Sequence, residues 1–384
     1  MKDVAQSRWE TKPLGEVCKF IGGGTPSKQN PAFWGGNFPW VSPKDMKSEI
    51  VSDSIDHVTE SAIEQSAAKR IPEGSLLIVV RSGILARTIP IAIAGRELTV
   101  NQDLKAMVPD KGLDRHFLAY FLRSAEGQLL DRVTRGATVH KLDMPLIKSL
   151  PIPFPPLEEQ RRIVAVLDEA FEGLARARAH TEANLQNARE LFESLRFAML
   201  SERTEGWEVH RLGDCFRLKS GDNLTAKKMV AGRFPVYGGN GIAGTHNESN
   251  LSGDNVIIGR VGALCGNARY IDQDIWLTDN AFKVVNYSFP FDCKFLTYLL
   301  NFKNLRSLAR QAAQPVISNS SLADLELKFP ASVELQAELA SKLAAAEMEL
   351  EVVQTKYEAK IQGLDDLRQS LLQKAFAGEL TKGN

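Results

Sequence analysis

The chain of 384 residues is electrically neutral, with 47 basic and 47 acidic side chains, and 43% of its residues are hydrophobic. This composition is ordinary for a soluble globular protein. No apolar run approaches the length of a membrane span, and the N-terminus lacks the apolar core of a signal peptide, so we expect a cytoplasmic protein without membrane contact. The four cysteines form no CxxC pair, and HExxH, GxxxxGK[ST] and GxSxG motifs are absent from the sequence, which argues against a zinc ribbon and several classes of enzyme.

The first distinctive segment, residues 20–43, reads FIGGGTPSKQNPAFWGGNFPWVSP. Because it is rich in glycine and proline, it predicts a loop, and loops of this kind need a scaffold and often carry recognition. Short apolar runs farther along, such as residues 75–80 (SLLIVV), predict strands of a compact mixed α/β domain. We interpret four tryptophans as core residues of this scaffold and its repeat: Trp9, Trp34, Trp40 and Trp207.

A long helical pattern follows the proline-rich joint LPIPFPPLEEQ at residues 150–160. From Ile163 to Ala198, mostly apolar residues recur at alternating spacings of four and three, and residues 339–371 repeat this pattern at the same phase after a second joint at 326–336. More than four heptads in each segment predict two helices that pack as a coiled coil. Polar residues interrupt both seams at equivalent places, Asn184 and Lys360, and either set the register of the helices or are incidental to a frayed middle.

An internal repeat organises the whole chain. Trp9-Glu10 recurs as Trp207-Glu208, 198 residues later, and RSGIL at 81–85 is answered by RVGAL at 260–264, 179 residues later. FLAY at 117–120 is answered by FLTY at 295–298, and Gln160 by Gln336, 176 residues later. The order is kept throughout, so the chain is predicted to be two copies of one unit.

Four segments follow from the repeat: a domain at 1–155, a helix at 156–202, a second domain at 203–330 and a C-terminal helix at 331–384. The predicted fold class is mixed α/β, with two repeated domains separated by long helices that form an antiparallel coiled coil in a pseudo-twofold arrangement. The first domain carries 20 basic and 17 acidic residues and the second 15 and 12, whereas each helix carries 6 and 9. Mildly basic domains beside acidic helices fit domains that face phosphates, although a mixed solvated surface would look the same.

Taken together, these features resemble the specificity subunit of type I restriction–modification systems. The resemblance is carried by W-E-x-x-x-L-G-[ED] at both domain starts, by GGGTPS, PWVSPKDM, RSGIL paired with GRVGAL, VYGGNGIAG and PLEEQRRI, and by the closing LRQSLLQKAFAGEL. It covers essentially the whole chain, and both copies of the repeat take part in it.

The resemblance implies a DNA-binding, non-catalytic subunit in which each globular domain reads one half of a bipartite double-stranded target. It implies that the helices set the spacing of the half-sites and dock two methyltransferase subunits, and in the full complex restriction subunits as well. No cofactor is expected on this chain; S-adenosylmethionine, ATP and Mg are expected on the partner subunits. A non-catalytic coiled-coil adaptor that binds proteins remains the alternative, and a recognition part of a single-chain nuclease–methylase is a third possibility.

Polar side chains on loops held by glycine and proline can reach base edges or phosphates. Arg81 and Arg260 are taken to occupy equivalent points of the repeat, where an arginine can read guanine, hold a phosphate or form a structural ion pair. The candidate DNA-contacting residues are Thr25, Ser27, Lys28, Ser42, Lys44, Asp45 and Arg81 in the first domain and Ser220, Asn223, Lys227, Lys228, Tyr237, Asn240 and Arg260 in the second.

Overall fold

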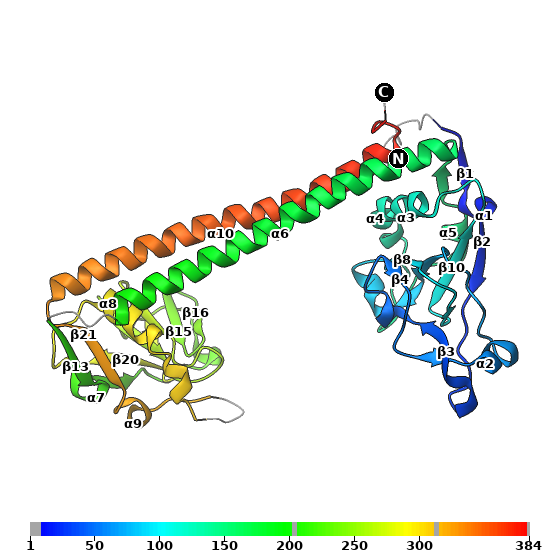
Figure 1. Ribbon diagram of the computed structural model, residues 1–384. Coiled ribbons are helices and arrows are strands. Elements are labelled where there is room, and N and C mark those ends of the chain that lie inside the picture. Colours follow the sequence, from blue (N-terminus) through cyan, green and yellow to red (C-terminus); the bar gives the residue numbers. More distant parts are fainter. Residues whose placement is uncertain (1–8, 202–205, 311–314, 382–384) are drawn as a thin grey trace. The chain divides into compact units, whose positions relative to one another are not determined.

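The computed structural model describes residues 9–201, 206–310 and 315–381. The chain divides into two compact units, of which unit 1 comprises Met1–Thr181 with Ala359–Asn384 and unit 2 comprises Glu182–Glu358. Each unit contains one globular domain and a segment of each long helix, α6 (Leu157–Ser201) and α10 (Val333–Phe376) (Figure 1). The predicted fold class, two repeated α/β domains with two long helices, is confirmed.

The globular domain of unit 1 is built on a five-stranded sheet in the order β2-β10-β6-β8-β4, with a three-stranded sheet β5-β3-β9 beside it. All strand pairs of the larger sheet are antiparallel except β4 with β8. Its elements are β1 (Thr11–Pro13), α1 (Leu14–Val17), β2 (Cys18–Gly22), η1 (Pro31–Phe33), β3 (Trp34–Val41), η2 (Pro43–Asp45), β4 (Ile50–Val51), β5 (His57–Val58), α2 (Glu60–Gln65), β6 (Leu76–Val79), β7 (Arg81–Ser82), η3 (Gly83–Ala86), β8 (Ile91–Ala94), β9 (Thr99–Val100), β10 (Leu104–Pro109), α3 (Arg115–Ser124), α4 (Glu126–Leu130), β11 (His140–Lys141), α5 (Met144–Lys148) and β12 (Pro151–Pro153).

Unit 2 repeats this architecture with a four-stranded sheet β14-β20-β17-β18 and a three-stranded sheet β16-β15-β19. In both units the smaller sheet contains one parallel pair, β3 with β9 and β15 with β19. The elements of its domain are β13 (Trp207–Arg211), α7 (Leu212–Cys215), β14 (Arg217–Ser220), η4 (Ala226–Lys228), β15 (Phe234–Gly238), β16 (Gly241–His246), β17 (Asn255–Gly259), β18 (Ala268–Ile271), β19 (Trp276–Leu277), β20 (Ala281–Val285), α8 (Cys293–Phe302), η5 (Leu305–Leu308), α9 (Asn319–Leu322) and β21 (Glu326–Pro330).

The core of unit 1 joins the sheet to the helices. All four residues of the central strand β6 are buried, which explains its continuous apolar sequence. Helix α3 is capped at its N-terminus by Asp114, whose carboxylate accepts hydrogen bonds from the backbone N–H groups of His116 and Phe117. Its buried face packs against α6 and the end of α10, where the ring of Phe376 makes edge contacts with Phe117 and Phe121 at 5.1 and 5.4 Å between centroids.

A buried glutamine joins each long helix to its domain. Gln160 accepts from the backbone N–H of Asp114 at 2.8 Å and donates to the carbonyls of Gly112 and Pro155, both at 2.9 Å. Gln336 makes the same set of bonds at the start of α10, to the backbone N–H of Asp292 and the carbonyls of residues 290 and 330. Both side chains are fully buried, so their hydrogen bonds fix where each helix leaves its domain.

Within unit 1, the two helices run antiparallel. The guanidinium of Arg368 stacks over Phe171 at 4.5 Å, and Arg178 forms an ion pair with Asp365 at 2.7 Å. In unit 2, Leu200 near the end of α6 shares a core with Leu343 near the start of α10, which again requires opposite directions.

The prediction that Asn184 and Lys360 interrupt the seam is wrong. Both side chains are exposed, whereas Leu185 is buried and Ile361 is partly buried. The spacing between successive residues on the buried side of each helix is four residues twice in succession here, through Thr181 to Leu185 in α6 and at the equivalent place in α10. A strict heptad would alternate spacings of four and three. Because 3.6 residues make one helical turn, an additional step of four compensates the drift of a strict heptad. Thr181, not Asn184, is the buried polar residue of α6 here, and its hydroxyl donates to the carbonyl of Ala177 at 2.7 Å.

Candidate nucleic-acid interface

The glycine-rich loop after β2 is held by two tryptophans of β3. The indole N–H of Trp40 donates to the carbonyl of Gly24 at 2.9 Å, and that of Trp34 donates to the carbonyl of Ser27 at 3.1 Å. The two rings meet edge to face at 5.2 Å, and Trp40 is buried. A Cβ on Gly23 would lie 1.9 Å from the carbonyl oxygen of Asn101, so only glycine permits this approach. The interpretation of Trp40 as a core residue is confirmed.

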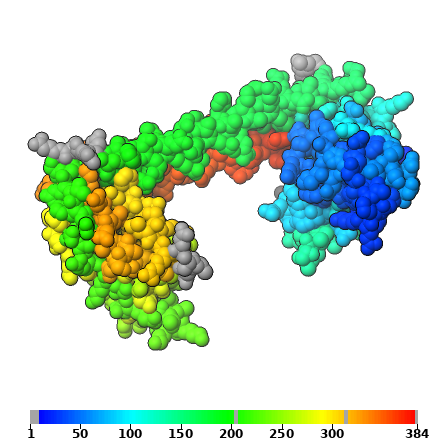
Figure 2. Space-filling model, turned by 60° about the horizontal axis from the view of Figure 1, so that its bottom comes forward, coloured from blue at the N-terminus to red at the C-terminus, as the bar shows by residue number. Residues whose placement is uncertain are grey.

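The polar residues of this loop lie at the surface of unit 1, in the dark blue segment of Figure 2. The hydroxyl of Thr25 donates to the side-chain carbonyl of Gln102, in the loop between β9 and β10. Ser27 and Lys28 are exposed, and the hydroxyl of Ser27 accepts from the backbone N–H of Gln29 at 3.3 Å. These side chains are therefore accessible to a ligand such as DNA.

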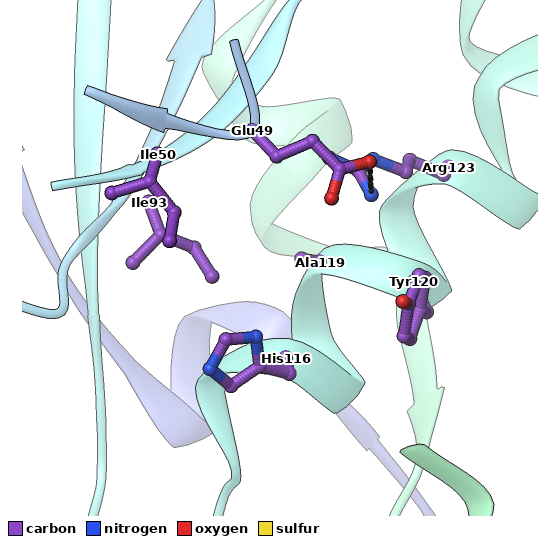
Figure 3. Close-up of a pocket in the computed structure, with 7 residues that line it drawn as sticks. All are labelled: Glu49, Ile50, Ile93, His116, Ala119, Tyr120 and Arg123. Carbon is purple, nitrogen blue, oxygen red and sulfur yellow. Dashed lines mark ion pairs between the residues drawn. The ribbon is translucent and has the colours of Figure 1, made fainter. Parts of the chain in front are cut away.

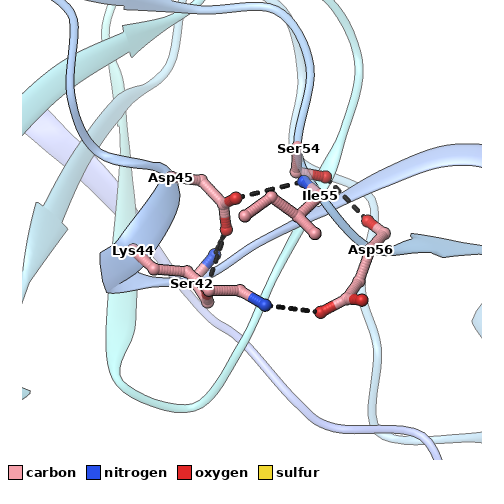
Figure 4. Close-up of polar contacts among 6 residues, drawn as sticks. All are labelled: Ser42, Lys44, Asp45, Ser54, Ile55 and Asp56. Carbon is pink, nitrogen blue, oxygen red and sulfur yellow. Dashed lines mark hydrogen bonds and ion pairs between the residues drawn. The ribbon is translucent and has the colours of Figure 1, made fainter.

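In the PWVSPKDM segment, two of the three candidate residues hold a turn. The Asp45 carboxylate accepts from the backbone N–H and the hydroxyl of Ser42 at 2.8 and 2.7 Å, and from the backbone N–H of Ile55 at 3.1 Å (Figure 4). Ser42 is buried. We therefore assign Ser42 and Asp45 a structural role, as the capping box of η2. Lys44 is exposed and pairs with Asp56 at 2.9 Å, and this hydrogen bond raises the pKa of Lys44.

The same two loops meet in unit 2. In unit 1 the backbone N–H of Gly24 donates to the carbonyl of Val100 at 3.0 Å, and in unit 2 that of Asp222 donates to Leu277 at 3.0 Å. A tryptophan again binds the loop, because Trp276 donates to the carbonyl of Asp222 at 3.4 Å. The loop after β14 therefore corresponds to the loop after β2, and the loop after β19 to the loop after β9.

Asn223 lies on this loop of unit 2, and its side-chain N–H donates to the carboxylate of Asp279 at 3.1 Å. Lys227 and Lys228 lie on η4 and are exposed. Tyr237 packs against the small apolar core of the second sheet, and its backbone carbonyl binds Thr278, so this residue is part of the scaffold.

The remaining candidates of unit 2 also serve its turns. The side-chain oxygen of Asn240 accepts from the backbone N–H of Leu264 at 2.9 Å, which fixes the turn after β15. The hydroxyl of Ser220 accepts from Arg260 at 3.3 Å. Asn240 nevertheless has an exposed side chain, whereas Ser220 is half-buried.

The two arginines do not occupy equivalent positions, contrary to the prediction. The backbone N–H of Val80 donates to Asp103 at 2.8 Å, and the matching bond in unit 2 runs from Arg260 to Asn280 at 2.9 Å. The Val80 carbonyl in turn accepts from the N–H of residue 142, as the Arg260 carbonyl accepts from that of residue 317. Arg260 thus matches Val80, and Arg81 matches Val261.

This shift of one residue explains why the arginines differ, because in extended chain it sends the side chain to the opposite face. The Arg81 side chain is 57% exposed, and its nearest acidic group, Asp103, lies 3.8 Å away. The guanidinium of Arg260 instead packs over Phe282 at 5.3 Å. Arg81 is therefore accessible to a phosphate or base, whereas Arg260 is largely committed to its own domain.

Sequence reasoning did not identify two polar residues beside the Gly-rich loop and Arg81. Gln102 is bonded to Thr25, and Lys141 lies opposite Arg81 on the short ribbon of β7 and β11, with its side chain 66% exposed. Nothing in the sequence indicates that the loop after β9, which carries Gln102, contacts the loop after β2.

Two cavities lined by described residues lie away from these loops. One of about 80 Å³ is lined by Glu49, His116 and Tyr120 among others, and there Glu49 pairs with Arg123 at 2.8 Å (Figure 3). A neighbouring cavity of about 290 Å³ contains Tyr120 and Asp168, which share a hydrogen bond. Burial and this bond raise the pKa of Tyr120. These groups brace α3 against α6. In the described part of the chain, no cluster of three or more histidine, cysteine or acidic residues could hold a metal ion.

None of the described helices is both long enough and apolar enough to cross a membrane.

Comparison with known proteins identifies a family. The sequence profile described as "Type I restriction modification DNA specificity domain" matches the chain twice, over residues 6–183 and 204–360. The chain is 41% identical over 162 residues to the Type I restriction enzyme EcoR124I/EcoR124II specificity subunit of Escherichia coli, a match that covers 42% of this chain and 40% of that protein. It is 28% identical over 363 residues to the Type I restriction enzyme EcoprrI specificity subunit of Escherichia coli, over 89% of this chain and 88% of that protein. The matched segment thus spans less than half the length of the first relative and most of the second.

The fold also has a counterpart among solved structures. One chain in the structure described as "Structural basis underlying complex assembly and conformational transition of the type I R-M system" superposes with a TM-score of 0.79, over 99% of this chain and 100% of that one. At 18% sequence identity this likeness concerns the fold alone.

Proposed function

This chain belongs to the type I restriction–modification DNA specificity family, and we propose that it is the DNA-reading subunit of such a system, in which each globular domain binds one half of a bipartite duplex target. The observation that carries this proposal is the repeated pair of loops. Both units bring the loop after the first sheet strand against the loop after the parallel pair, and they present different side chains there. A shared scaffold with different polar groups is what two unlike half-sites require.

The long helices serve as the docking surface for the other subunits in this proposal. Leu191 and Leu367 lie at equivalent places of the repeat and are both exposed, at 72% and 47%. Exposed apolar side chains on a helix are available to pack against another subunit, as apolar residues do in the core of an interface. Two equivalent sites fit two methyltransferase subunits, and restriction subunits would complete the complex. S-adenosylmethionine, ATP and Mg would then bind to those partners, and this chain would supply recognition without catalysis.

The test is the DNA methylation pattern of cells with and without this gene, in the presence of the partner methyltransferase. The proposal expects a bipartite motif that disappears when the gene is deleted. Replacing residues 1–155 by the corresponding domain of a relative should change one half of the motif and leave the other intact.

The alternative, a protein-binding adaptor, makes the opposite expectations. An adaptor would leave the methylation pattern unchanged on deletion, and it would bind duplex DNA neither tightly nor with a strong dependence on salt. A specificity subunit with its partners should lose affinity steeply as salt rises, because counterions released from the phosphates contribute to binding.

A further inference from the structure

The two units make one side-chain hydrogen bond at the same structural position but with different chemistry. Thr25 is the third residue after β2, and Asn223 is the third after β14. Gln102 is the second residue after β9, and Asp279 is the second after β19. Thr25 donates to Gln102 in unit 1, and Asn223 donates to Asp279 in unit 2. The equivalent backbone bonds between these loops confirm the correspondence.

Each acceptor keeps hydrogen-bonding groups that are not used by the described residues, on an exposed side chain for Gln102 and on a half-buried one for Asp279. The Gln102 side chain is exposed, and Thr25 occupies only its carbonyl oxygen, so among the described residues its two amide N–H donors have no partner. Asn223 occupies one carboxylate oxygen of Asp279, and within the same part of the chain the other oxygen accepts no hydrogen bond. Thr25 and Asn223 thus hold the side chains of Gln102 and Asp279 in place and leave part of their hydrogen-bonding capacity free.

We propose that Gln102 and Asp279 read one base in each half of the target. This inference rests on the proposed function and adds the residues and the bases. An amide with a free donor and a remaining lone pair can pair with adenine through its N6 amino group and N7. A carboxylate can only accept, and its preferred partner in the major groove is the N4 amino group of cytosine. The first domain therefore selects adenine at this position, and the second selects cytosine. Thr25 and Asn223 are positioning residues.

Basic side chains near Gln102 are consistent with its proposed contact with a base. Arg81 and Lys141 lie opposite each other on the ribbon of β7 and β11. The chain enters β7 directly after Val80, whose backbone N–H donates to the carbonyl of Asp103, the residue after Gln102. The side chains of Arg81 and Lys141 are both more than half exposed. Cations placed next to a base-reading amide can hold the flanking phosphates and keep the groove in register.

The decisive experiment exchanges the two chemistries in the full chain, co-expressed with its methyltransferase partner. Gln102→Glu should change the preferred base in the first half-site from adenine to cytosine, and Asp279→Asn should change the second half-site from cytosine to adenine. Each change should alter a single position by about tenfold or more, as is typical for a mismatched base pair. Methylome sequencing reads the motif, and selection from a duplex library with randomised half-sites measures the preference of the complex directly.

Two controls separate reading from packing. Gln128→Glu makes the same substitution on an exposed residue of α4 and should leave the motif unchanged. Thr25→Val removes the positioning donor and should relax the first half-site at that same position without selecting a new base. Thermal unfolding of every variant shows whether the domain is intact.

Three results would overturn the inference. An unchanged motif for Gln102→Glu would mean that the residue reads nothing, and a uniform loss over all sequences would mean a phosphate contact. Complete loss of binding with an unchanged melting temperature would also count against it, since one acceptor has replaced another and should select a new base. A wild-type complex without any bipartite motif would instead refute the proposed function.

Discussion

Gln160 offers a quantitative test of how the helices are attached to the domains. Its side chain is fully buried and makes three hydrogen bonds, to the N–H of Asp114 and to the carbonyls of Gly112 and Pro155. Gln160→Met keeps the length of the side chain and removes all three bonds. Gly112 is exposed, so its carbonyl can bind water instead, but the other two groups lose their partner in a buried or half-buried place.

Each buried polar group left without a partner costs about 1–3 kcal/mol, so two of them should lower the free energy of unfolding of unit 1 by about 2–6 kcal/mol. For a folded unit of this size, that corresponds to a decrease of the melting temperature on the order of 5–15 °C. Circular dichroism during thermal and urea unfolding measures both quantities. Gln336→Met should have a similar effect on unit 2, because the set of bonds is the same.

Gln186→Met is the matched control. Gln186 lies on the same helix, is exposed and donates to Glu190 at 2.8 Å, so its loss should change the free energy of unfolding by less than about 0.5 kcal/mol. If Gln160→Met behaved like this control, the buried glutamine would not anchor the helix and the reasoning from burial would fail.

Three further outcomes are expected. Burial raises the pKa of Cys18 to about 12 and of Cys215 to about 11, whereas thiols of the unfolded chain ionise near 8.5. As the pH rises from about 9 to 11, each thiol should therefore lower the free energy of unfolding by up to about 1.4 kcal/mol per pH unit. Urea unfolding measured against pH should give a shallower slope for a variant with alanine at both positions, and an equal slope would contradict this. The purified chain without partners should transfer no methyl group to DNA and should not cut it, as measured with labelled S-adenosylmethionine and a supercoiled plasmid. Inserting one heptad after Ala177 and another after Gln362, close in sequence to the Arg178–Asp365 ion pair that joins the two helices, adds about 10 Å to each helix. The unread spacer should then lengthen by about 3 bp with both half-sites unchanged. Altered half-sites with the same spacer would show that the helices do not set the spacing.

The repeat predicted from the sequence accounts for much of the fold. The glutamine pair at 160 and 336 stands out in the sequence only as a repeated letter, and the structure gives it the same three bonds in both units. The helical seams are correct at Ile163, Leu167 and Leu343, which are buried, but the same heptads also place Leu191 and Leu367 in the seams, and both are exposed. The seams are also wrong at Asn184 and Lys360, because a strict heptad continued past the point where the real helix takes an additional step of four.

The candidate site was harder to predict, because a polar residue in a loop can serve either its own backbone or a ligand. Ser42 and Asp45 look like surface groups in the sequence, yet their hydrogen bonds close a turn. Arg81 and Arg260 align in the sequence, because the residues around them are similar, but the hydrogen bonds of the strands place them one residue apart. Arg81 is exposed to solvent, whereas Arg260 packs over Phe282.

The contact between the loop after β2 and the loop after β9 explains why Gln102 could not be predicted from the sequence. In unit 1 the bonded residues Thr25 and Gln102 are 77 positions apart, and in unit 2 Asn223 and Asp279 are 56 apart, since the intervening segment is shorter. No single sequence offset aligns both loops of unit 1 with those of unit 2. The residue types also differ, because Thr25 and Gln102 are replaced by Asn223 and Asp279. What the two units share is the backbone position of Gln102 and Asp279. Substitution of this single residue can place either an amide or a carboxylate there. A scaffold of this kind can change one base of its target without disturbing its fold, because the reader is held by a neighbouring loop and not by the core.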